Sequence, residues 1–220
     1  MRAVAWILPL VTAASAGAAE GADTFFQQLD LSAATPSGFT GALSYTPTFR
    51  FFDRLNTGLG ARFSSFFGGE GVAFPNGDPS LIAAGATDRF IVDQPRSYAL
   101  NLMFAIALRL FAGLEVGMNI DLVGVGFGPH VTGEYVSTDP TLSGPQRAGP
   151  SRLNLLLFGT HDHGQLDSEF FAAYWSSSWG IRVGASHMST EYTTDNGLIG
   201  NNDRFRASYT RVFASVGYRF

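Results

Sequence analysis

The stretch GASHMSTEY, residues 184–192, carries the side chains best suited to covalent chemistry. His187 and Ser189 are two residues apart, and Glu191 follows at the same spacing. Residues two apart share one face of a strand, so an imidazole can approach a hydroxyl there. A base beside a hydroxyl, with a carboxylate to orient the base, is the arrangement of nucleophilic catalysis. The alternative interpretation is the polar end of a strand with no catalytic role.

Two other stretches are weaker candidates. HDHG, residues 161–164, places two imidazoles two residues apart, which would suit a transition metal with further ligands from elsewhere. A tight turn explains the same residues, and the chain has no Cys, so we predict no metal and no cofactor. VGVGFG, residues 123–128, resembles a phosphate-binding loop, but no predicted helix follows it to supply an N-terminus.

The elements that must position these residues are long strands. In FTGALSYTPTFRF, residues 39–51, apolar and polar side chains alternate over 13 positions. Soluble strands typically have about 5–6 residues, whereas a tilted strand that crosses a bilayer needs about 9–11. No segment after the N-terminal stretch shows helical periodicity. The predicted strands are 27–35, 39–52, 56–67, 98–110, 114–126, 153–160, 166–175, 179–192 and 204–220.

Two all-β architectures are compatible with strands of this pattern. A soluble β-sandwich with a solvated face is the alternative to a membrane barrel. Strand length, aromatic outer faces, and tight turns that alternate with the long connections 68–97 and 127–152 favour a closed barrel with an apolar exterior. Six basic and five acidic residues fall on the inner face: Asp30, Arg50, Arg62, Arg109, Glu115, Asp121, Asp167, Glu169, Arg182, Arg211 and Arg219. From them we predict a lumen ion-pair network of Arg50, Arg62, Arg109, Glu115, Asp121, Glu169, Arg182 and Arg211.

The last residues, SVGYRF, alternate up to Phe220. With Tyr218 two residues earlier, this ending resembles the terminal strand of bacterial outer-membrane β-barrels of the small OmpA/OmpX-like class. The resemblance implies that Tyr218 and Phe220 form an assembly signal read by the barrel-assembly machinery. LDSEFFAAYW, TEYTTDN and NDRFR resemble an uncharacterised group of such barrels; this resemblance supports the fold and carries no known activity over to this chain.

The predicted strand count is nine, whereas bacterial single-chain barrels have an even number. If 153–160 and 166–175 form one irregular strand, the barrel has eight strands. If His130–Ser137 is a further strand, it has ten. We favour eight, because that number keeps every long loop outside the cell.

The pair His187 and Ser189 also resembles the His-x-Ser motif of the lipid A 3-O-deacylases, which are small outer-membrane barrels. The resemblance implies that His187 is the base and Ser189 the nucleophile. At the position of the family's acidic residue this chain has Asn201, so Asp203, two residues further, becomes the candidate acid. Thr190 stands where the family commonly has Asn.

The N-terminal residues predict export. Arg2, the apolar residues 3–11 and SAGAAE predict a cleaved signal peptide over residues 1–19, which leaves 20–220 as the barrel domain. The apolar stretch is about half of the roughly 20 residues that a spanning helix needs. A net charge of −4 without a basic patch argues against nucleic acid as a partner.

Together these features predict an all-β protein, a closed antiparallel transmembrane β-barrel of eight or ten strands in the outer membrane of a Gram-negative-type bacterium. Its surroundings would be outer-membrane lipids and lipopolysaccharide. The predicted role is structural, in surface contacts or envelope integrity, without catalysis. The alternatives are an ester hydrolase acting on lipid A or phospholipid through His187 and Ser189, and a narrow pore for small apolar molecules.

Overall fold

The structure, a computed structural model, describes residues 24–35, 38–137 and 139–220. The predicted signal peptide, residues 1–19, lies outside the described residues. In the described part of the chain, no helix has the length and apolar character needed to cross a membrane.

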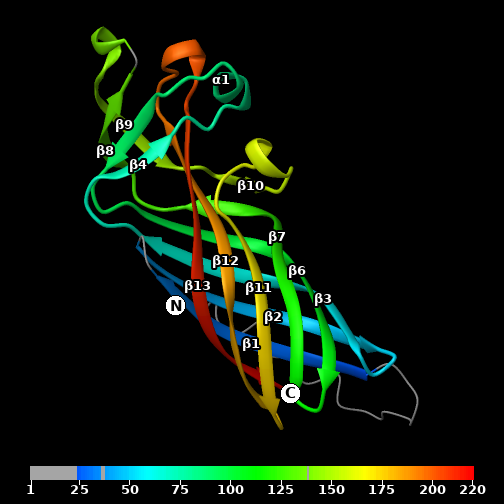
Figure 1. Cartoon of the computed structure of the whole chain (residues 1–220). Coiled ribbons are helices and arrows are strands. Elements are labelled where there is room, and N and C mark those ends of the chain that lie inside the picture. The colour runs from blue at the N-terminus through cyan, green and yellow to red at the C-terminus, as the bar shows by residue number, and fades with distance from the viewer. Residues whose placement is uncertain (1–23, 36–37, 138) are drawn as a thin grey trace, which may run out of the picture.

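Eight long antiparallel strands form a closed barrel (Figure 1). Each strand pairs with the next in the chain order given below, and the last pairs with the first from Gln28 opposite Arg219 to Thr35 opposite Val212. Along these residues the sheet has no unpaired strand edge, and the apolar core of a bilayer requires such closure because it cannot satisfy free backbone groups. The strands are β1 (Thr24–Thr35), β2 (Phe39–Phe51), β3 (Leu55–Phe67), β6 (Arg96–Phe111), β7 (Leu114–Phe127), β11 (Leu166–Ser176), β12 (Trp179–Thr194) and β13 (Arg204–Arg219).

The strand count confirms eight. The predicted strand 153–160 is wrong in its length, because only β10 (Leu153–Leu155) is extended. It pairs with Val123–Val125 of β7, while β11 pairs with residues 114–120 of the same strand. β10 and β11 therefore act as one irregular strand opposite β7. The segment between them contains the 3-10 helix η3 (Gly159–His161) and lies beside the long loops, so HDHG is not a turn between two barrel strands.

The side chains of the barrel strands follow the predicted alternation. Outward side chains form an apolar exterior, whereas inward charged residues such as Arg62 and Asp121 are completely buried. In β7 the alternation changes phase at a register irregularity: Leu102 lies opposite Val123 and Met103 opposite Asp121. The exposed outer residues include Leu29, Leu31, Leu43, Leu59, Phe63, Leu100, Leu102, Val125, Phe170, Ile181, Val183, Val212 and Val216.

Two aromatic groups border this apolar exterior. At the end with the long loops, the rings of Phe39, Phe67, Tyr98 and Phe127 contact one another in series, with centroid distances of 6.3, 6.0 and 5.8 Å. At the end with the tight turns, Tyr218 lies against Trp179 at 4.9 Å and Phe220 at 5.9 Å. Outer-membrane barrels carry aromatic girdles at both interfaces.

The tight turns 52–54, 112–113 and 177–178 all lie at one end of the barrel. Gly113 has a φ of +80°, and a Cβ at this position would meet Trp175 O at 2.7 Å, so this turn requires glycine. Short turns face the periplasm and longer loops face the exterior in barrels of this kind. We therefore call the two ends the periplasmic end and the extracellular end.

The long loops fold into an extracellular extension of the sheet, which corrects their prediction as plain connections. β9 (Gly144–Pro150) pairs with the end of β12, followed by β8 (Val131–Val136), β5 (Arg89–Val92) and β4 (Val72–Pro75). The ring closes on β13 through Asn76 opposite Phe205 and a 2.8 Å hydrogen bond from Gly77 N to Arg204 O. Residues 131–136 are thus a strand, but one of the extension and not a tenth barrel strand. Figure 1 shows the extension above the barrel, with α1 (Pro79–Ala83), η2 (Pro140–Leu142) and η4 (Ile199–Asn201) near its tips.

Candidate functional site

Arg62 lies at the centre of the lumen and is completely buried. Its Nη2 is 2.7 Å from Glu169 Oε2, and its Nη1 is 3.5 Å from Asp121 Oδ1 and 3.9 Å from Asp167 Oδ2. The partners come from β7 and β11, so this cluster ties three strands together across the barrel. Replacing Glu169 would remove the shortest of these three ion pairs from a buried guanidinium.

Arg182 extends the cluster toward β1. Its Nε is 3.3 Å from Asp30 Oδ1, and its Nη2 is 3.9 Å from Glu169 Oε2. The guanidinium also lies over the ring of Phe171, 4.8 Å from its centroid. Glu169 is therefore shared by two arginines, and the network crosses the lumen without interruption.

A second cluster lies at the periplasmic mouth. Arg219 Nη2 is 2.6 Å from Glu115 Oε2, and Arg50 Nη2 is 3.7 Å from Glu115 Oε1. Arg219 also stacks on Trp175, with 3.6 Å from Cζ to the ring centroid. Arg109 lines the cavity at this mouth beside the same residues.

Two predicted network residues, Arg109 and Arg211, form no ion pair with a carboxylate among the described residues, and Arg211 lies at the extracellular side of the lumen. Arg211 donates to Thr40 Oγ1 and contacts Met188 Sδ. Its Nε is buried without a hydrogen-bond partner.

Side chains fill the barrel interior. The cavity bounded by Asn56, Asn119 and Phe171, between the two clusters, has a volume of about 20 Å³. About 10–15 Å³ of such space holds one water molecule, so this cavity has room for about one. Eight-stranded barrels typically have an interior that side chains can just fill, and this lumen follows that rule.

His187 and Ser189 lie on the outer face of β12, near its extracellular end, and line one cavity of about 430 Å³. His187 is exposed, and its Nδ1 is 3.0 Å from Thr210 Oγ1 on β13. Ser189 is 7% exposed, and its hydroxyl donates to Gly164 O at 3.5 Å. In the described residues no hydrogen bond joins the imidazole to the serine hydroxyl.

The structure does not bring Asp203 to His187. Thr210 is the residue opposite His187 in the β12–β13 register. Asp203 precedes Thr210 by seven residues, which is roughly 20 Å of extended chain. A third catalytic residue would have to orient the imidazole from this position. The side chain here is that of Thr210, a neutral hydroxyl.

Residues 156–162 cover this cavity, and two arginines of β13 hold them in place. Arg206 donates to the carbonyl oxygens of Asp162 and Thr160, the latter at 3.0 Å. Arg204 donates to Asp162 O at 2.8 Å and forms an ion pair of 2.8 Å with Glu191. Glu191 shares a strand face with His187 and Ser189 in the sequence, but in the structure it forms an ion pair with Arg204 and so helps to hold residues 156–162. In the sequence, NDRFR places Arg204 and Arg206 two residues apart and therefore on one strand face, which is the signal that could have identified this pair.

The histidines of HDHG lie in the segment between β10 and β11. His161 ends η3, and His163 is paired through its backbone with Leu155 at 3.0 and 3.1 Å. Burial, together with nearby Arg204, lowers the pKa of His163. Among the described residues, no three His, Asp or Glu side chains form a group that could hold a metal ion.

An apolar core joins the extracellular extension to the extracellular ends of the barrel strands β3, β12 and β13. Phe74 and Tyr192 meet at a centroid distance of 5.0 Å, and Tyr135 lies 5.7 Å from Phe205. These side chains come from both long loops and from the β12–β13 hairpin, so the loops are packed on one another. The buried cluster is Phe66, Phe74, Phe90, Val92, Tyr135, Ala148, Met188, Tyr192, Phe205 and Ala207.

Tyr218 and Phe220, the predicted assembly signal, lie at the periplasmic end of β13. Two backbone hydrogen bonds of 3.0 and 3.1 Å join Phe220 to Gln27 of β1. Both aromatic rings belong to the outer aromatic group at this end.

No family model matches the chain, and no curated protein matches it. Among solved structures it is similar to Neisserial surface protein A, with a TM-score of 0.42, 9% identity, and coverage of 90% of this chain and 99% of that one. It is also similar to Ail, the attachment invasion locus protein of Yersinia pestis, with a TM-score of 0.34, 13% identity, and coverage of 90% and 97%. A major outer membrane protein from Thermus thermophilus gives a TM-score of 0.35, 14% identity, and coverage of 90% and 100%.

The chain has the fold of a small outer-membrane β-barrel. Four features of the structure are typical of this fold: eight closed antiparallel strands, an apolar outer band between two aromatic groups, a charged interior, and tight turns opposite long loops.

Proposed function

We propose that this protein is a non-enzymatic component of the outer membrane of a Gram-negative-type bacterium, whose role lies in contacts at the cell surface. On this proposal a signal peptide over residues 1–19 directs export, and Tyr218 and Phe220 are read by the barrel-assembly machinery. The partners at the membrane are outer-membrane lipids and lipopolysaccharide.

The packed extracellular extension is the observation that carries this proposal. Loops packed around a buried core keep one shape and present fixed side chains, at the cost of ordering many residues. Ile82 of α1 is 38% exposed and Leu142 of η2 is 49% exposed near the tips of the extension. Apolar side chains held in solvent at fixed positions suit contact with another surface.

Cell-surface assays with matched variants test this role. Cells that carry the wild-type protein should aggregate or attach to coated surfaces more than cells that lack the gene. Ile82→Asp and Leu142→Asp together should reduce that difference several-fold at unchanged protein level. Thr132→Asp, at an exposed position of β8, is the control. Equal attachment with and without the gene would contradict the proposal.

Ester hydrolysis at His187 and Ser189 is the second candidate function, because both side chains open into the same cavity at the outer rim. Replacing Ser189 with Ala and measuring lipid A acylation in cells tests it. An acylation pattern that stays unchanged when the whole gene is deleted would exclude the hydrolase.

The filled lumen argues against the third candidate, a pore. Planar-bilayer recordings of the wild-type protein should show little conductance, because two ion-pair clusters occupy the interior. Steady open channels would contradict this expectation.

A further inference from the structure

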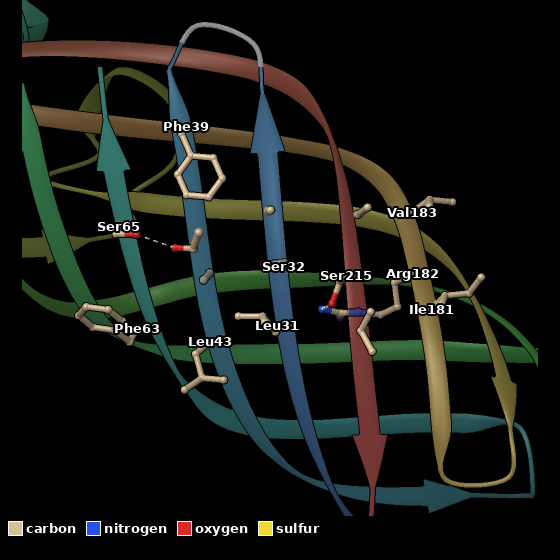
Figure 2. Close-up of a pocket in the computed structure, with 15 residues that line it drawn as sticks. Leu31, Ser32, Phe39, Leu43, Phe63, Ser65, Ile181, Arg182, Val183 and Ser215 are labelled. Carbon is tan, nitrogen blue, oxygen red and sulfur yellow. Dashed lines mark hydrogen bonds between the residues drawn. The ribbon is translucent and has the colours of Figure 1, made fainter. Parts of the chain in front are cut away.

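We propose that the outer wall of the barrel binds one acyl chain of a phosphate-bearing lipid of the outer leaflet. The site is a groove of about 890 Å³ over β12, β13, β1, β2 and β3 (Figure 2). This proposal goes beyond the surface role, since it requires only the membrane-spanning barrel.

The groove follows from the size of the side chains in two adjacent rows across five strands. The strand registers align the residues of each row. The floor consists mainly of small residues, and the row on its periplasmic side consists of large apolar ones, while Phe39 borders it on the extracellular side. The floor row is Val183, Ala214, Ala33, Gly41 and Ser65, and the large row is Ile181, Val216, Leu31, Leu43 and Phe63.

Gly41 shows that the depression is not a requirement of the backbone. A Cβ at Gly41 would meet its nearest atom, Phe39 Cε1, at 3.5 Å, which is ordinary contact. Each of the other glycines in the eight described barrel strands would place a Cβ between 1.9 and 2.5 Å from its nearest atom. Those glycines are needed for close packing of the barrel, whereas Gly41 leaves open space on the outer wall.

Three polar side chains at the groove already have hydrogen-bond partners. The hydroxyl of Ser65 donates to Gly41 O at 3.1 Å, the dashed line in Figure 2. Arg182 and Ser215 also border the groove, but the guanidinium donates to the serine hydroxyl at 3.2 Å and pairs with Asp30 in the lumen. Arg182 Nε, which has no hydrogen-bond partner, is buried 3.3 Å from Asp30 Oδ1, so the groove offers mainly apolar contact to a ligand.

An acyl chain fits the path of the groove. Five strands at about 4.8 Å spacing give a length of roughly 19 Å, comparable to an extended fatty-acyl chain. The groove also runs obliquely: Ser65 lies ten residues from the periplasmic start of β3, but Val183 lies only four from that of β12. A chain that enters from the outer leaflet beside β3 would descend toward the membrane centre at β12.

A second copy of the barrel fits this groove less well. The outer wall of a barrel is convex, so two barrels in contact meet along a narrow line. A second barrel would therefore leave most of the groove unfilled. A flexible chain can follow the floor over its whole length. Loss of contacts across an unfilled gap forfeits much of the dispersion attraction.

A basic residue lies at the extracellular end of the groove, where a headgroup would be. Phe39 is opposite Phe67, and Phe67 is opposite Arg96 in the next pair of strands. Arg96 is exposed, and two strand spacings separate it from Phe39, roughly 10 Å. A guanidinium at this place can bind a lipid phosphate, which is why the proposal names a phosphate-bearing lipid.

Photolabelling tests the acyl-chain site. The folded protein is placed in vesicles that contain phosphatidylglycerol with a photoreactive group in its acyl chain, and labelled peptides are mapped. Labelling of β1 and β2 should exceed labelling of β11 several-fold. Ala33→Leu and Gly41→Leu, which fill the floor, should each remove that excess. Ala172→Leu, at an exposed outer position of β11, should leave it unchanged.

Three results would overturn the proposal. One is uniform labelling around the wild-type barrel, and another is an excess that persists in both groove-filling variants. The third is a crosslinked dimer that Ala33→Leu abolishes, since a second copy would then occupy the groove. Heat-modifiable gel mobility verifies that each variant is folded, and neither groove variant alters the extracellular tips that carry the proposed surface role.

A comparison of two lipids tests the role of the phosphate headgroup. A neutral glycolipid with the same photoreactive chain should label the groove several-fold less than phosphatidylglycerol does. Arg96→Gln should abolish this preference, whereas Arg54→Gln, exposed at the periplasmic turn, should retain it. Equal labelling by the two lipids would overturn the role of the phosphate.

Discussion

Arg62 Nη2 lies 2.7 Å from Glu169 Oε2 inside the barrel, and both side chains are buried. Glu169 also accepts a 2.9 Å hydrogen bond from Asn119 and lies 3.9 Å from Arg182. One carboxylate thus joins residues of β3, β7 and β12. In a barrel with an apolar exterior, such interior contacts are the specific interactions that hold the strands at fixed positions.

Replacing Glu169 with Ala should destabilise the barrel strongly. Two arginines would lose a shared partner in the lumen, and breaking a buried ion pair costs about 3–5 kcal/mol of unfolding free energy. Urea unfolding of the protein in lipid vesicles, followed by gel mobility, measures the change. Glu70→Ala, at an exposed loop position, should change the unfolding free energy by about 0.5 kcal/mol or less. Equal stability of the two variants would contradict the role of the network.

Replacing Arg206 with Ala should release residues 156–162 from the outer wall. The guanidinium donates to carbonyl oxygens of Asp162, Gly159 and Thr160, and the variant would leave these oxygens without that donor. Limited proteolysis of intact cells should then cleave this segment several-fold faster. Arg147→Ala is the control, since Arg147 is 66% exposed and lies 3.7 Å from Asp195. Unchanged cleavage in Arg206→Ala would show that the segment is held by other contacts.

Acidification should loosen the same segment through His163. Its folded-state pKa is lowered by burial and by Arg204, so the unfolded or opened segment binds the proton more strongly. The stabilisation is therefore complete above the opened-state pKa, about 6.5, and is lost as the pH falls through the lower folded-state value. Arg206, Glu191 and Asp162 also act on this imidazole.

Hydrogen exchange of residues 156–165 measures this effect. Exchange, corrected for its intrinsic pH dependence, should rise between pH 7 and pH 5 in the wild-type protein. His163→Gln should remove most of the rise, while His130→Gln, at an exposed position in the extension, should not. A rise that persists in His163→Gln would assign the effect to another group.

The barrel could be predicted from the sequence because its signal repeats at many positions. Inward residues such as Arg62 and Asp121 alternate with lipid-facing ones over 12 to 16 positions in most strands. The extension could not be predicted in this way, because β4 and β5 have four residues each and bury only Phe74, Phe90 and Val92. Their pairing depends on contacts between loops that are distant in the sequence.

The candidate site shows the same limit. The shared face of His187 and Ser189 follows from spacing alone, and both line one cavity. The distance to Asp203 depends instead on the register of the β12–β13 hairpin, which places Thr210 opposite His187. Spacing along the sequence does not give the register of a hairpin. The residue that lies beside His187, Thr210, could therefore not be predicted from the sequence.

Replacing Phe90 with Ala should unfold the extension and leave the barrel intact. Phe90 is completely buried in the core of the extension and lies 5.9 Å from Phe205, centroid to centroid. Loss of such a ring costs about 3–5 kcal/mol, a large fraction of the stability of a small sheet. The lumen network lies in the barrel and has no member in β4, β5, β8 or β9, so the barrel should keep its own stability.

Hydrogen exchange and gel mobility separate the two effects. In Phe90→Ala, amide protection should fall in β4, β5, β8 and β9, while heat-modifiable mobility and protection in β1–β3 remain as in the wild-type protein. Phe170→Ala, whose ring is 58% exposed on the outer wall of β11, should preserve protection in the extension. If Phe90→Ala also abolished the folded gel form, the extension and the barrel would fold as one unit, and the long loops would be part of what keeps the barrel closed.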